Sequence, residues 1–187
     1  MQLVGLKAIY VGNVLPRGVK AAATSEGNDS ALDMMKKFTR IMQPYKGGIS
    51  TNFSNPSSTK FYREGESNPF FAIFDPTSGE KSLTWNVADF DDADDDQKLS
   101  TMSFYFGKEA PAKGEMYEGE KAFVFVTESG KSLAFARLKY AATLTGGLNT
   151  SDPLQIAVSA EVLAPPQGGV AWWPIDTPEF DEDSKEE

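Results

Sequence analysis

Residues 58–90 read STKFYREGESNPFFAIFDPTSGEKSLTWNVADF, and this stretch decides the fold. Two apolar runs, at 70–74 and 83–87, flank a turn signal at 75–79 that contains a proline and a glycine. Within the second run Leu83, Trp85 and Val87 alternate with polar residues, as in a half-buried strand. The stretch therefore predicts a β-hairpin built from these two runs.

Similar short runs on both sides of this hairpin predict further strands. The run at 122–126 is apolar on both faces, which predicts a fully covered strand that turns through 127–130 into a second hairpin. Residues 29–38 have helical spacing and begin with two potential N-caps, Asp29 and Ser30, although a loop that leads into a strand near 38–42 is the alternative there. The expected fold class is mainly β, an antiparallel β-barrel or sandwich with one or two short helices. The other predicted strands span 6–11, 49–54, 59–64, 101–106, 115–120, 131–141 and 154–162.

The length of the chain indicates one domain. A chain of 187 residues can bury a substantial hydrophobic core. We expect this domain to span 1–165, with a loop or mobile arm at 16–28, and a C-terminal extension with an acidic tail at 166–187. The first residues lack the features of a signal peptide, and no apolar run approaches the roughly 18 residues of a membrane span. These features predict assembly in a cytoplasm and no membrane span.

The composition argues against most enzyme mechanisms. The chain has no cysteine and no histidine, which removes thiolate chemistry, the commonest general base and the commonest metal ligand. Its 27 acidic residues make carboxylate pairs inevitable, but sequence spacing does not establish the geometry of two-carboxylate hydrolysis. We therefore expect no catalytic, cofactor-binding or metal-binding residues, and an acid-based hydrolase is poorly supported.

Negative charge is concentrated in two segments. Residues 89–96 contain six aspartates and no base, and residues 175–187 contain seven acids and one lysine, within a net charge of −9. The aspartate segment lacks the mid-loop glycine and the closing glutamate of a common calcium loop. This favours a solvated acidic loop that acts through its electric field. The aspartates concerned are Asp89, Asp91, Asp92, Asp94, Asp95 and Asp96.

Two other groups of residues are candidates for contacts between subunits. The adjacent Trp172 and Trp173 could anchor the C-terminal extension on a neighbouring subunit, or could cover one end of the protein's own barrel. In the predicted strand at 154–162, Gln155, Ser159 and Glu161 form a polar face opposite an apolar one. Such a strand could lie at a sheet edge and pair with another copy.

Residues 59–70, followed by 82–89, resemble a phage major tail (tail tube) protein. The similar elements are a strand with an acidic patch, a strand led by a proline, a hairpin, and a strand that closes on an aspartate before a short helical turn. Residues 6–12 and 158–162 also lie where that family has strands, so the resemblance spans most of 3–165 as a pattern of elements. It implies a structural role in a virion tail, with hexameric rings stacked into a tube, contacts with other tail proteins, and transient, non-specific passage of DNA.

The resemblance leaves the position of residues 89–96 in the tube open. These aspartates could lie on the outer wall or at a contact between rings, or they could line the lumen and repel DNA phosphates. The alternative to a tail tube is a soluble β-sandwich that binds a carbohydrate or a protein through exposed aromatic side chains.

Overall fold

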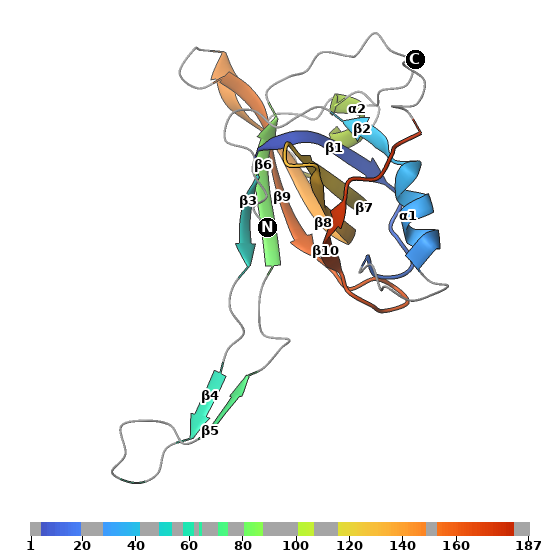
Figure 1. The fold of residues 1–187 in the computed structure, drawn as a ribbon. Helices are drawn as coiled ribbons and strands as arrows, with labels where there is room; N and C mark the ends of the chain where they lie inside the picture. Colours follow the sequence, from blue (N-terminus) through green and yellow to red (C-terminus); the bar gives the residue numbers. More distant parts are fainter. Residues whose placement is uncertain are drawn as a thin grey trace.

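An antiparallel sheet of eight strands forms the body of the protein in this computed structural model (Figure 1). The strand order is β2-β1-β7-β8-β9-β6-β3, with β10 also paired to β8, while β4 and β5 form a separate sheet. The structure describes residues 5–19, 28–41, 49–53, 58–61, 64, 71–74, 81–87, 101–106, 116–148 and 153–181. The elements are β1 (Leu6–Gly12), α1 (Asn28–Lys36), β2 (Thr39–Ile41), β3 (Ser50–Phe53), β4 (Ser58–Phe61), β5 (Phe71–Phe74), β6 (Lys81–Val87), α2 (Thr101–Phe106), β7 (Met116–Thr127), β8 (Lys131–Leu148), β9 (Pro153–Val162) and β10 (Trp172–Asp176). The expectation of a mainly β, antiparallel fold with short helices is confirmed.

The main sheet bends around a core without closing into a barrel, and the result is sandwich-like. Strands β7 and β6 are three places apart in the sheet order, so about 14 Å would separate them in a flat sheet. Trp85 of β6 nevertheless contacts Phe123 and Phe125 of β7, with ring centroids 5.8 Å apart in both pairs. Within the described ranges, the two ends of the sheet order, β2 and β3, do not pair with each other.

A β-bulge in β8 lies between the part of this long strand that pairs with β10 and the part that pairs with β9. Lys121 of β7 lies opposite Leu138, and Phe123 lies opposite Phe135, so β8 has one extra residue between these pairs. Before the bulge β8 pairs with β10, and after it β8 pairs with β9. Without the bulge, residues 135 and 138 would face opposite sides of the sheet. Because of it, Phe135 and Leu138 both enter the core inside the bend.

Both faces of β7 are covered, as its sequence predicts. Phe123 and Phe125 enter the core inside the bend, whereas Val124 belongs to a second cluster on the other face. That second cluster also contains residues of α1, of the chain after β1 and of the C-terminal segment. There Phe180 stacks on Tyr10 with ring centroids 3.5 Å apart. The second hairpin, from β7 through a turn into β8, is also confirmed.

The predicted helix is present as α1, and burial of one face explains it. Ala31 and Met35 are four residues apart and both are buried, and Phe38 just beyond the helix is buried as well. Met34, which the spacing also places on the apolar face, is 37% exposed. The helix begins at Asn28, before the predicted N-caps.

The strand predicted at 101–106 is instead the helix α2. Its last three residues, Phe104, Tyr105 and Phe106, are all buried in the core inside the bend. Three consecutive buried side chains do not fit a strand with one covered face, whereas the end of a short helix can direct all of them inward. Packing in the core therefore overrides the strand preference of aromatic residues.

The first predicted hairpin is also wrong, because β5 does not pair with β6. Strand β5 pairs with β4, and β6 lies between β3 and β9. The alternation predicted for β6 is correct: Leu83, Trp85 and Val87 are buried and the residues between them are exposed. Trp85 lies opposite Val158 of β9, so the apolar faces of β6 and β9 meet in the core. A pairing of β6 with β5 would not bring these two faces together. The turn signal at 75–79 lies outside the described residues.

Two boundaries also differ from the sequence prediction. The strands expected at 115–120 and 122–126 form one continuous strand, β7. Residues 16–19, expected to belong to a mobile arm, are anchored: Val19 is buried and its backbone N–H donates to the Val170 carbonyl at 2.9 Å. A Cβ at Gly18 would collide with the backbone of Val170, so this close approach requires glycine. Asn28, the last residue of the expected arm, begins α1, and residues 20–27 lie outside the described residues.

Candidate assembly surfaces

The β4–β5 hairpin is the least supported part of the described chain. Figure 1 shows it standing apart from the main sheet, and its two strands pair with no other strand among the described residues. Phe61 and Phe71 lie opposite each other in the register, with ring centroids 5.9 Å apart. Their exposed fractions are 41% and 55%, respectively. An isolated two-stranded hairpin is marginally stable in water at best, so this hairpin is a candidate for contact with another surface.

The two ends of the main sheet are candidates for pairing between subunits. Among the described strands, β2 pairs only with β1, and β3 pairs only with β6. Each therefore presents one row of backbone N–H and C=O groups without a partner strand. Ser50, Thr51 and Asn52 of β3 are exposed. Both edges are short, with three residues in β2 and four in β3, and short edge strands limit unwanted pairing.

The strand at 154–162 is not a sheet edge, contrary to expectation. It forms β9, and its backbone pairs with β8 on one side and with β6 on the other. Its backbone is paired on both sides from Ile156 to Glu161 and cannot add a strand from another copy there. Ser159 and Glu161 can therefore contact a neighbour only through their side chains, whereas Gln155 lies beyond the part paired with β6 and is paired with Thr145 of β8.

These side chains belong to a broad polar face of the sheet. Ser159 lies between Thr84 of β6 and Ala141 of β8, and Glu161 lies opposite Lys139 of β8. Ser159 and Glu161 are exposed and Gln155 is half-buried. Glu118 pairs with Lys139 at 3.1 Å, so part of the charge on this face is balanced. The face is thus covered mainly by small or polar residues, and its role in assembly remains a prediction.

The two tryptophans have different surroundings. Trp172 is half-buried, and its ring lies 4.7 Å from Phe53 and 6.3 Å from Phe135, measured between centroids. It therefore covers the protein's own core. Trp173 points to the other face of β10 and is 38% exposed. Contact of Trp173 with a neighbouring subunit stays a prediction.

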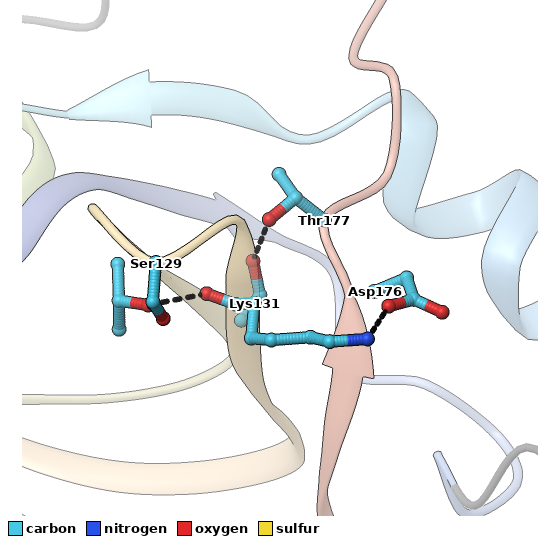
Figure 2. Close-up of polar contacts among 6 residues, drawn as sticks. Ser129, Lys131, Asp176 and Thr177 are labelled. Carbon is cyan, nitrogen blue, oxygen red and sulfur yellow. Dashed lines mark hydrogen bonds and ion pairs between the residues drawn. The ribbon is translucent and has the colours of Figure 1, made fainter. Parts of the chain in front are cut away.

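Polar contacts fix β10 and the chain after it to the start of β8 (Figure 2). Lys131 forms an ion pair with Asp176, and the Ser132 hydroxyl lies 3.0 Å from that of Thr177. Lys131 is itself held by the β7–β8 turn, where the Thr127 hydroxyl of β7 donates a hydrogen bond to the Lys131 carbonyl at 2.7 Å. The extension predicted from residue 166 thus contributes a strand to the main sheet. Its acidic residues 182–187 lie outside the described part of the chain, as do the aspartates at 89–96.

Buried tyrosines in the core have a structural role. Trp85 Nε1 donates a hydrogen bond to the Tyr105 hydroxyl at 2.8 Å, and burial raises the pKa of Tyr105. Burial also raises the pKa of Tyr140 to about 12. Both hydroxyls therefore stay protonated at neutral pH. Within the described ranges, no group of three or more Asp, Glu, His or Cys residues is placed to hold a metal ion.

Sequence reasoning missed the exposed Phe61 and Phe71. Phe71 belongs to one of the two runs of the predicted hairpin and Phe61 to the separate predicted strand at 59–64, and the sequence pattern singles out neither as exposed. The proline and glycine signals on both sides of 58–74 could have marked this segment as an insertion between β3 and β6.

Comparisons with known proteins do not assign a family. A scan against protein-family models found no match, and a search of curated proteins also found none. In the described part of the chain, neither helix is long and apolar enough to cross a membrane.

Proposed function

We propose that this protein is a structural protomer of a phage tail tube, which forms stacked, hexameric rings around a conduit for DNA. The observation that carries this proposal is the β4–β5 hairpin, which stands apart from the body with two phenylalanines exposed. A two-stranded sheet of four residues per strand has little to stabilise it alone. Another protein surface would supply the missing apolar contacts.

The open edges of the sheet support assembly into rings. Strands β2 and β3 lie at opposite ends of one antiparallel sheet, so each copy has two different edges to offer. Pairing of β3 in one copy with β2 in the next joins different surfaces, and such a contact forms a closed ring when the rotation between copies is suitable. It would also satisfy both rows of backbone groups.

The role proposed is non-enzymatic, in the virion tail after assembly in a host cytoplasm. The polar face that includes Ser159, Thr84 and Asn86 has few large or basic side chains to hold a nucleic acid. Such a surface suits transient, non-specific passage of DNA. The hairpin suits contact between rings, and the ends of a tube would meet other tail proteins.

Electron microscopy and analytical ultracentrifugation of the purified protein test the proposal. We expect rings or tubes on the order of 100 Å wide, the scale of six small domains around a channel, formed in a concentration-dependent manner. Addition of duplex DNA at physiological salt should leave the tubes and their sedimentation unchanged. A strict monomer over a thousandfold concentration range contradicts the proposal and favours the soluble binding module.

A further inference from the structure

An apolar pocket of about 490 Å³ opens beside the edge strand β3. Its walls come from five strands of the main sheet and from β10, and its main side chains are Leu6, Phe53, Leu83, Phe125, Leu133 and Trp172. None of the described residues that line it is charged. The volume lies in the range of pockets that receive a ligand or an anchoring side chain, about 300–1,000 Å³. Thr51 of β3 lines the pocket and is exposed, so it lies at the rim.

The same chain carries apolar side chains of matching chemistry. Phe61 and Phe71 occupy one face of the β4–β5 hairpin and are among its exposed residues. Thr59, two residues before Phe61, lies on that face and is exposed, whereas Lys60 lies on the opposite face. The phenylalanine-bearing face of β4 is therefore uncharged, as the pocket is. Insertion would bury aromatic surface without burying a charge.

We propose that this pocket receives Phe61 and Phe71 from the hairpin of a second copy of the chain. A second copy is the occupant because the hairpin of the same copy stands apart from the main sheet in Figure 1. The donor and the acceptor are different surfaces, so each copy can donate to one neighbour and accept from another. The inference rests on the self-assembly part of the proposed function, and it names the contact that covers the hairpin.

Cross-linking tests this contact directly, because the chain has no cysteine of its own. One preparation carries Thr59→Cys on the hairpin, and a second, enlarged by a fusion tag, carries Thr51→Cys at the rim. A short bismaleimide should join the two preparations into one heterodimer band, which only a contact between copies can produce. Adding Phe61→Ser and Phe71→Ser to the hairpin preparation should lower the yield at least about tenfold, since buried aromatic anchors dominate such contacts.

Matched controls use the opposite faces of the same strands. Lys60→Cys replaces Thr59→Cys on the hairpin, and Asn52→Cys replaces Thr51→Cys on β3. Both sites are exposed, and each lies next to the tested position. Either control should give at least about fivefold less heterodimer than the tested pair, because neighbouring strand residues point to opposite faces.

Two results would overturn the inference. The first is a heterodimer yield no higher than the yield of the control pairs, or one that is unchanged when both phenylalanines are removed. The variants compared must have the melting temperature of the parent protein. The second is cross-linking within a monomer when Thr59→Cys and Thr51→Cys are combined in one chain, since it would place the hairpin on its own pocket. Rings or tubes that form without this contact would leave the tail-tube proposal intact. A specific heterodimer without rings or tubes would instead support the contact and contradict the tail tube.

Discussion

The β7–β8 pair and the β4–β5 pair are both antiparallel, yet they are stabilised in different ways. Strands β7 and β8 have neighbours on both sides, and their apolar side chains enter clusters on both faces of the sheet. Among the described strands, β4 and β5 pair only with each other, and the phenylalanines that lie opposite each other across them are exposed. Backbone pairing is the same in both places, so the difference lies in what covers the side chains. The first pair stabilises the monomer, whereas the second has little apolar cover among the described residues and should be marginally stable by itself.

The largest effect expected from this comparison is that of a proline in β9. Ile156→Pro removes a ladder hydrogen bond and a buried side chain, which together should cost about 5 kcal/mol. We expect loss of cooperative unfolding and of the folded monomer, measured by circular dichroism during a urea titration. Ile156 lies between Val87 and Leu144 in the register, so either neighbouring strand loses support.

The matched variant is Ala72→Pro in β5, which lies opposite Lys60. It should leave the melting temperature of the monomer unchanged and reduce only self-association. If both proline variants unfold alike, the hairpin is part of the cooperative core and the comparison fails.

The next effect concerns phenylalanine in the same two regions. Phe123→Ala should destabilise the monomer by about 3–5 kcal/mol, because this fully buried ring contacts Trp85, Phe125 and Tyr140. Phe71→Ala should change monomer stability by less than about 0.5 kcal/mol, since the side chain is exposed. Urea unfolding at low protein concentration measures both values. Equal costs would mean that Phe71 is buried in the monomer.

A smaller effect should appear at alkaline pH. The pKa of Tyr140 is raised from 10.0 to about 12 by burial, so the folded state favours the protonated hydroxyl. Above pH 10 the unfolded chain loses this proton first, and stability therefore falls as pH rises from 10 towards 12. Melting temperatures of the parent protein and of Tyr140→Phe, measured between pH 8 and 11, should diverge only above pH 9–10. If the melting temperatures of both proteins fall in parallel, the loss of stability comes from other groups, such as lysines.

The smallest effect is expected for an ion pair on the polar face. Lys139 and Glu118 lie 3.1 Å apart, but each side chain is 48% exposed. Solvent and salt screen such a pair, so a double-mutant cycle with Lys139→Ala and Glu118→Ala should give a coupling of about 0.2–1 kcal/mol. A coupling of several kcal/mol would show that this face is covered in the assembled state or in the monomer.

Local patterns were sufficient for individual strands but not for their partners. The alternation of Leu83, Trp85 and Val87 predicted a half-buried strand correctly, because a strand with one buried face has an apolar residue at every second position. It could not show that this strand pairs with β9, since pairing depends on which apolar faces meet in the core. For 101–106, a short aromatic run fits a strand and a helix equally well, and periodicity alone does not separate them.

The candidate surfaces were harder to predict for a related reason. Whether Trp172 is covered depends on Phe53, which lies far from it in sequence and contacts it only after the sheet has bent. The exposure of Phe61 and Phe71 follows from a sheet order that no local pattern encodes. Edge positions likewise depend on the full topology, which is why β9 was mistaken for an edge.

The position of β1 has a consequence for how fast the chain folds. Ile9 pairs with Phe125 and Ile41, so β1 is held mainly by β7, a strand from the second half of the chain. During synthesis β1 has to wait until β7 has left the ribosome, and most of the chain is made before the central sheet can form. Sheets with such distant pairings fold in milliseconds to seconds rather than microseconds. Unpaired strand edges are exposed during that interval, so folding competes with aggregation at high expression.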